Sequence, residues 1–236
     1  MSEDAKLFLL VFFSINFSVL FIFLINAFIK SAKKRKKQNR VNHFGDSAEK
    51  KVAKYIEKNL RFCTLIRDVY LKTENGLTEI DQILICDRGI FIIEIKSHNG
   101  YIITKGKHWT QRWGNKVVRF HNPTIQNNVH KTALENILKK RQSIASLPIY
   151  TVTVFTSSKV SFSENVKNVI RLPLLAKFVK NKPRNKRISE TVVASVEKLI
   201  RNNMETSRRK QEKHKRRIYQ NNDKKRAYHT NRFSVK

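Results

Sequence analysis

The sequence predicts an α/β domain, with a mixed β-sheet flanked by helices, preceded by a single transmembrane helix. Two observations support this prediction. Short β-prone runs alternate with amphipathic helical patterns along the middle of the chain, which favours a sheet covered by helices. A long uncharged apolar segment lies near the N-terminus. The 236 residues are enough for one ordinary domain with extensions at its ends.

Residues 7–29 form the apolar segment, which contains no charged side chain. As a helix, 23 residues would cross a hydrocarbon core of roughly 30 Å. The segment is longer than the apolar core of a signal peptide, and the first six residues lack the basic start of one. Residues 30–41 form a basic juxtamembrane linker suited to anionic lipid. This linker predicts a single-pass protein of the cell membrane with residues 1–6 outside and the C-terminal domain in the cytoplasm.

The globular domain is expected over residues 42–175. An amphipathic helix is predicted at residues 44–60. Its apolar stripe consists of Val52, Ala53, Ile56 and Leu60. A second helix is predicted from Asn122-Pro123, a capping residue followed by a proline in the first turn, to about residue 141. Strands are predicted at residues 64–71, 79–86, 90–96, 101–104, 117–120, 150–156 and 169–172.

Beyond this domain, residues 176–203 are predicted to form a linker and a C-terminal helix, and residues 204–236 a basic, disordered tail. The formal net charge is +31, and most of the excess lies outside the globular domain. Such a charge favours polyanionic partners, namely nucleic acid and anionic lipid. The six glycines form no glycine-rich loop, which excludes P-loop and Rossmann nucleotide sites.

The strand at residues 90–96 carries two charges in an otherwise apolar run. Glu94 and Lys96 are two residues apart, so both leave the strand on the same face. If Ile85 pairs with Ile90 across the intervening tight turn, Asp81 of the preceding strand lies opposite Glu94. A shift of the register by one residue would send the two carboxylates to opposite faces.

Two carboxylates facing each other in a partly buried sheet destabilise it unless a cation relieves the repulsion. Hard oxygen ligands of this kind suit Mg²⁺ or Mn²⁺, with Asp81 and Glu94 as metal ligands. Lys96 would then steer or deprotonate an attacking water, or neutralise charge that develops on a phosphate. Glu49 lies on the apolar stripe of the first helix and is a third candidate carboxylate. The structural alternative is an ion pair at a sheet edge, with Glu49 at the border of its stripe.

Other candidates carry less chemistry. The seven histidines are scattered without metal-ligand spacing, and solvated or capping roles are expected for them. Trp109 and Trp113 lie among basic residues, where stacking on nucleic-acid bases would fit, but packing at the end of the sheet is the favoured role.

The pattern Asp81 followed by Glu94-Ile95-Lys96 resembles the PD-(D/E)XK nuclease motif, and its surroundings resemble the nuclease-related domain, NERD. The resemblance covers about residues 44–138. It rests on an ordered set: Gly45 and Glu49, Ile80-Asp81, Gly89-Ile90-Phe91, Glu94-Ile95-Lys96, Gly100, Trp109, and Asn122-Pro123 with Gln126. Two positions depart from the family pattern, since Ile80 replaces the proline of the motif and Ala48 replaces a glycine.

The resemblance implies a restriction-endonuclease-like fold and a metal-dependent phosphodiesterase site. Asp81 and Glu94 would bind Mg²⁺ or Mn²⁺, Lys96 would handle the water or the phosphate, and Glu49 and Gln126 would support them. A membrane-anchored nuclease acting on DNA or RNA at the cytoplasmic face is therefore expected. Two alternatives stay open: a catalytically inactive, membrane-tethered nucleic-acid-binding protein, and a scaffold at the lipid surface.

Overall fold

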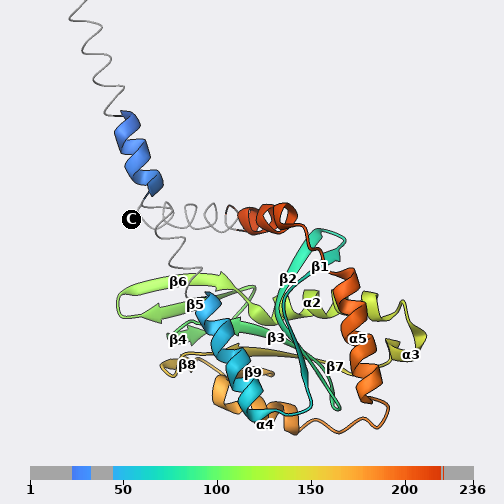
Figure 1. Ribbon diagram of the computed structural model, residues 1–236. Coiled ribbons are helices and arrows are strands. Elements are labelled where there is room, and N and C mark those ends of the chain that lie inside the picture. Colours follow the sequence, from blue (N-terminus) through green and yellow to red (C-terminus); the bar gives the residue numbers. More distant parts are fainter. Residues whose placement is uncertain (1–22, 33–44, 219, 221–236) are drawn as a thin grey trace, which may run out of the picture. The chain divides into compact units, whose positions relative to one another are not determined.

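The computed structural model describes residues 23–32, 45–218 and 220 (Figure 1). The chain divides into two units, Met1–Ser47 and Ala48–Lys236. In the first unit, residues 23–32 are helical. Most of the predicted transmembrane segment, residues 7–22, lies outside the described residues, as do residues 33–44. Within the described part, no helix is both long enough and apolar enough to cross a membrane.

The second unit is built on a five-stranded sheet with the order β1-β2-β3-β7-β9. These strands are β1 (Thr64–Thr73), β2 (Gly76–Cys86), β3 (Gly89–Lys96), β7 (Ile149–Phe155) and β9 (Val169–Arg171). The pairs β1–β2 and β2–β3 are antiparallel, whereas β3–β7 and β7–β9 are parallel. The prediction of a mixed sheet is thereby confirmed.

The predicted register of the β2–β3 hairpin is also confirmed, because Ile85 lies opposite Ile90. The turn is closed by Gly89, whose φ is +137° and whose Cβ, if present, would lie 2.7 Å from the carbonyl oxygen of Pro148. Only glycine adopts this conformation without strain at such a close approach. The ladder ends at Gln82 and Ile93, so the two strands separate just before Asp81 and Glu94.

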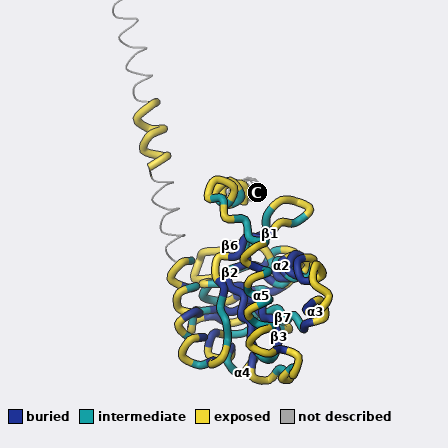
Figure 2. Tube along the Cα trace, turned by 45° about the vertical axis from the view of Figure 1, so that its right-hand side comes forward, coloured by how far each residue is buried: buried dark blue, intermediate teal, exposed yellow. Residues whose placement is uncertain are grey.

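Helices cover both faces of the sheet. On one face, the helix of residues 45–59 and α4 (Leu175–Lys180) pack against alternate residues of β2, β3 and β7. On the other face lie α2 (Pro123–Leu138), the short α3 (Gln142–Ala145) and α5 (Glu190–Asn203). Figure 2 shows the buried residues gathered along the strands between these layers. The result is the predicted α/β arrangement of a mixed sheet flanked by helices.

A second sheet of four strands has the order β6-β5-β4-β8. Its strands are β4 (Gly100–Ile103), β5 (His108–Trp113), β6 (Lys116–His121) and β8 (Val160–Phe162). The sequence predicted neither β5 nor β8, because the residues of β5 are mostly polar and β8 is only three residues long. Trp109 is fully buried where this sheet packs on Phe155 of β7, which confirms the packing role predicted for Trp109.

The C-terminal part of the prediction needs correction in two places. Part of the predicted linker is α4, whose Val179 is buried in the core, whereas the predicted C-terminal helix is present as α5, with Ile200 buried in the core. Residues 208–218 are helical rather than disordered. Lys215 of this helix lies 3.2 Å from the carboxylate of Glu79 in β2, which supplies a partner that composition alone does not reveal. Residues 221–236 of the predicted tail lie outside the described residues.

The two cysteines are free thiols, yet they are not isolated from each other. Thr64 pairs with Ile85 at the end of the β1–β2 ladder, so Cys63 and Cys86 are the next residues along the two strands. The Cys63 thiol donates to the carbonyl oxygen of Arg61 at 3.3 Å, and the neighbouring Cys86 thiol, followed by burial, raises the pKa of Cys63. Separation in the sequence therefore concealed a cross-strand contact.

Candidate active site

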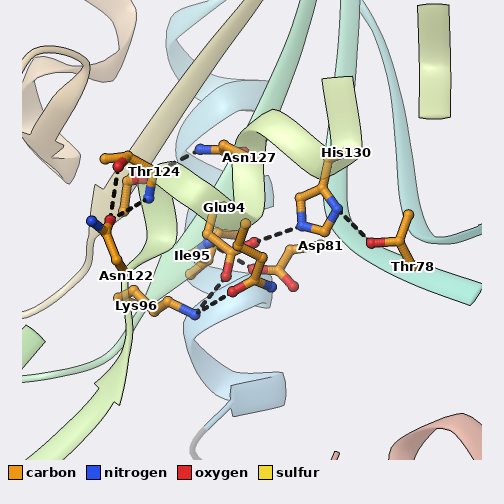
Figure 3. A network of polar contacts seen from close by, with 11 residues as sticks. Thr78, Asp81, Glu94, Ile95, Lys96, Asn122, Thr124, Asn127 and His130 are labelled. Atoms are coloured by element: carbon orange, nitrogen blue, oxygen red, sulfur yellow. Dashed lines mark hydrogen bonds and ion pairs between the residues drawn. The ribbon is translucent and has the colours of Figure 1, made fainter. Parts of the chain in front are cut away.

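Three predicted site residues, Glu94, Lys96 and Gln126, gather on the face of β3 that α2 crosses. Asp81 reaches them from β2, whereas Glu49 belongs to the helix of residues 45–59 on the other face. Glu94 and Lys96 leave β3 on the face of α2, and α2 contributes His130 directly above Glu94 (Figure 3). Gln126 lies one helical turn before His130 on the same side of α2, because residues four apart share a helix face. The location follows from the sequence, since Asn122 caps α2 by accepting a hydrogen bond from the backbone N–H of Thr124 at 2.9 Å.

Glu94 is the centre of the polar network and is only 1% exposed. Its Oε1 lies 2.5 Å from Nζ of Lys96, and its Oε2 lies 3.2 Å from Nε2 of His130. Burial by itself raises the pKa of Glu94, but the Lys96 ammonium and the His130 ring outweigh it and hold the pKa below its usual value. Glu94 is therefore ionised at neutral pH despite its burial.

Asp81 approaches the same point from β2. Its Oδ2 accepts a hydrogen bond of 2.6 Å from the backbone N–H of Ile95, so the carboxylate reaches across to β3 where the ladder has ended. Removal from water and then the charge of Glu94 raise the pKa of Asp81 well above its usual range, and Glu49 adds to the rise. Lys96 and the hydrogen bond from Ile95 offset only part of this effect. The surroundings of Asp81 therefore disfavour the negatively charged form of its carboxyl group.

Lys96 connects β3 to α2. Its Nζ lies 3.5 Å from Oε1 of Gln126 in addition to its contact with Glu94. Burial would lower the pKa of Lys96, but the carboxylates of Glu94 and Asp81 outweigh burial and raise it. The Lys96 side chain is 18% exposed, so part of it reaches the rim of the site. Gln126 therefore lies beside Lys96.

Glu49 is held near the site by the backbone of its helix. The side-chain amide of Gln82 donates a hydrogen bond of 2.8 Å to the carbonyl oxygen of Glu49. The Glu49 carboxylate is close enough to raise the pKa of Asp81. Glu49 is half-buried. This agrees with its place on the apolar stripe of the helix, and its carboxylate stays near polar groups.

Sequence reasoning missed His130, which is 1% exposed. Its Nδ1 lies 2.8 Å from the hydroxyl of Thr78 in β2, and its Nε2 faces Glu94. A buried histidine with both ring nitrogens engaged fixes the carboxylate that it contacts. The sequence feature that could have indicated His130 is its spacing of four residues from Gln126, which puts both side chains on one face of α2.

A divalent cation fits the donors of this site in part. Among residues 45–218, no group of three His, Cys, Asp or Glu side chains is arranged to hold a metal ion. Asp81 and Glu94 nevertheless supply hard oxygen donors of the kind that Mg²⁺ prefers, and Mg²⁺ commonly takes its other ligands from water and phosphate. The raised pKa of Asp81 marks the excess negative charge that a cation would neutralise.

Comparison with known proteins bears on this geometry. Residues 44–156 match the nuclease-related domain, NERD. The match extends past the resemblance read from the motifs, to the end of β7, and every predicted site residue lies inside it. A 110-residue stretch is 31% identical to an uncharacterized protein of Bacillus anthracis. That stretch covers 45% of this chain, and this chain spans about half (52%) of the length of that relative. The NERD match indicates a nuclease-related function for the domain.

The electrostatics of the candidate site predict a metal-dependent change in stability. Because its pKa in the folded state is raised, Asp81 favours folding below its unfolded pKa, and this contribution is lost as the pH rises through the folded value. Without metal at neutral pH, Asp81→Asn is therefore expected to stabilise the protein by about 0.2–1 kcal/mol, the range for like charges on neighbouring strands. Mg²⁺ should raise the melting temperature of the native protein and not that of the variant.

Thermal melting followed by circular dichroism, with Mg²⁺ or with EDTA, tests this expectation. Asp87→Asn is the matched control, because Asp87 is a partly exposed acid whose Oδ2 lies 3.1 Å from Nε of Arg184. It should show no gain in stability and should keep the response to Mg²⁺. Equal responses of Asp81→Asn and the native protein to Mg²⁺ would contradict a cation at Asp81.

Proposed function

We propose that this protein is a membrane-anchored nuclease that hydrolyses phosphodiester bonds of DNA or RNA at the cytoplasmic face and requires Mg²⁺ or Mn²⁺. The observation that carries the proposal is the convergence of Asp81, Glu94 and Lys96 beside β3 within the NERD match. The anchor rests on the uncharged apolar run of residues 7–29 and the basic residues that follow it.

Asp81 and Glu94 would hold the divalent ion, which when bound supplies Lewis-acid stabilisation of a phosphoryl oxygen and favours deprotonation of water. The chain's own residues do the remaining work. The Lys96 ammonium would bind a non-bridging oxygen of the scissile phosphate and neutralise charge as it develops there. Gln126 would orient Lys96, and His130 would hold Glu94 in one rotamer. The basic regions of the chain supply affinity for the phosphate backbone that depends on salt.

A second candidate is a membrane-tethered nucleic-acid-binding protein without catalytic activity. It is favoured by one observation, namely that both oxygens of Glu94 are already engaged by Lys96 and His130. In that case Glu94 and Lys96 form a structural ion pair, and the nuclease-like fold serves binding alone.

A cleavage assay separates the two candidates. The full-length chain, solubilised in mild detergent, is incubated with supercoiled plasmid, single-stranded DNA and RNA in the presence of Mg²⁺, Mn²⁺ or EDTA. We expect cleavage of at least one substrate with Mg²⁺ or Mn²⁺ and none with EDTA. Tight, salt-sensitive binding without cleavage under any condition would reject the nuclease and leave the binding protein.

A further inference from the structure

The β5–β6 hairpin presents an aromatic side chain to solvent at its tip. Trp113 is 59% exposed, whereas Trp109, four residues earlier on the same strand, is fully buried. Register explains the difference. Trp109 pairs with Phe120 over the small core, and Trp113 pairs with Lys116 beyond it. Nζ of Lys116 lies 5.8 Å from the centre of the Trp113 ring, a cation–π distance.

The surroundings of this tryptophan are uniformly basic. No acidic residue occurs between Glu94 and Glu135 in the sequence. Five basic side chains on the hairpin and its approach are exposed, at Lys105, Lys107, Arg112, Lys116 and Arg119. An exposed aromatic ring on a hairpin whose charged residues are all basic is a combination that binds the backbone and one base of a nucleic-acid strand.

The hairpin is fastened to the candidate active site at two points. The backbone N–H of Asn122, which caps α2 one turn before Gln126, donates to the carbonyl oxygen of Lys107 at 3.1 Å. Gly100, four residues after Lys96, packs under Trp113, since a Cβ at Gly100 would lie 3.3 Å from that of Trp113. The hairpin and the rim residues Lys96 and Gln126 therefore belong to one rigid part of the domain.

We propose that the β5–β6 hairpin is a platform for single-stranded nucleic acid, on which Trp113 stacks one unpaired base while the basic residues contact the adjoining phosphates. The inference rests on the proposed function and names its substrate class, a strand that is single or locally unpaired next to the site. Stacking on a duplex would require a base to leave the helix, which costs a few kcal/mol. The platform therefore favours strands that are already open.

An anionic lipid surface also attracts tryptophan beside cations. Nucleic acid is the better occupant because the platform is continuous with Lys96, which the proposed function assigns to a phosphate. Trp113 would provide one stacking position at a fixed place on the hairpin, and such a position suits a single nucleic-acid base.

Tryptophan fluorescence of the full-length protein tests the platform directly. The chain contains two tryptophans, and Trp109 is buried, so quenching by a stacked base reports Trp113. The protein is titrated in EDTA with an oligothymidylate of twelve nucleotides, its RNA counterpart, a matched duplex, and phosphatidylglycerol vesicles. We expect quenching by the single strands and little by the duplex. Because the Trp113 variants lack the reporting ring, the binding of all variants is compared by the fluorescence anisotropy of dye-labelled oligonucleotides. Trp113→Ala should weaken single-strand binding roughly 5- to 150-fold, the effect of losing one stacked base, and leave duplex binding unchanged.

Val117→Ala is the matched control, because Val117 is 62% exposed on the same hairpin and pairs with Arg112 rather than with Trp113. This control should bind single strands like the native protein, and Trp113→Phe should fall between the native protein and Trp113→Ala. Equal effects of Trp113→Ala on single strands and duplex, or an effect confined to vesicles, would overturn the platform. Because EDTA prevents cleavage, this outcome is independent of the cleavage assay, and either proposal can fail alone.

Discussion

Replacing Lys96 by methionine is expected to reduce metal-dependent cleavage by roughly 10²–10³-fold, the loss that follows removal of one charge-stabilising donor from a preorganised site. Methionine keeps most of the length of the side chain and removes the charge. The Lys96 ammonium lies 2.5 Å from Oε1 of Glu94, and its side chain is partly exposed at the rim of the site. Single-turnover cleavage of the substrate identified for the native protein, with saturating Mg²⁺, measures the effect.

Two companion variants distinguish a chemical role of Lys96 from a structural one. Lys131→Met changes an exposed lysine of α2, whose Nζ lies 3.6 Å from Oε1 of Glu135, and should keep cleavage within about two-fold, since surface changes of this kind have small effects. Lys96→Arg keeps a positive charge beside Glu94 and should retain more cleavage than Lys96→Met. If Lys96→Met cleaves like the native protein while remaining folded, Lys96 belongs to a structural ion pair and the proposed mechanism is wrong.

The part of the site that the sequence predicted depends on local rules. A tight turn at Gly89 fixes the β2–β3 register, and the alternation of side chains along a strand then puts Glu94 and Lys96 on one face. Asn122-Pro123 marks the start of α2, which determines where Gln126 lies. Each of these rules acts over a few residues, so a single sequence suffices to apply them.

The parts that the sequence did not predict depend on contacts between distant segments. His130 resembles any helical histidine until the fold brings Thr78 and Glu94 to its two ring nitrogens. Trp109 and Trp113 share a strand face, and only the extent of the core beneath β5 buries one and exposes the other. The helix of residues 208–218 is basic and polar, so its composition does not indicate that it packs on the domain. Its contact with the sheet, through Lys215 and Glu79 of β2, depends on the tertiary structure.

These contacts also explain why a nuclease-like core tolerates a buried carboxylate. Glu94 sits among isoleucines on β3, where an unpaired charge would cost several kcal/mol. Lys96 from the same strand and His130 from α2 compensate it from opposite sides. The stability of the fold and the arrangement of the candidate site therefore depend on the same three side chains. A variant that removes one of them should affect both the stability and the site.

His130→Phe is expected to show this dependence most clearly. Phenylalanine fills a similar volume but leaves Oε2 of Glu94 and the hydroxyl of Thr78 without their partner inside the core. Loss of such a contact to a buried charge costs roughly 2–4 kcal/mol, which for a chain of this size lowers the melting temperature by roughly 4–16 °C. His121→Phe, the same change at an exposed histidine of β6, should shift stability by no more than about 0.5 kcal/mol.

The stability difference between the native protein and His130→Phe should also depend on pH. Burial raises the pKa of Glu94, but Lys96 and then His130 lower it and together hold it below its usual value. Since the folded pKa lies below the unfolded value of about 4.3, Glu94 contributes stability above that value and loses it as the pH falls through the folded pKa. The difference should therefore be largest near neutral pH and shrink in acid, as measured by chemical denaturation across that range.

A double-mutant cycle completes the test of the His130–Glu94 contact. Combining His130→Phe with Glu94→Gln removes the charge that His130 compensates, so the double variant should lose less stability than the two single variants added together. A difference that does not change with pH, together with additive single variants, would mean that His130 is packed in the core without holding Glu94. The coupling energy thus measures directly how strongly α2 fixes the carboxylate on which the proposed chemistry depends.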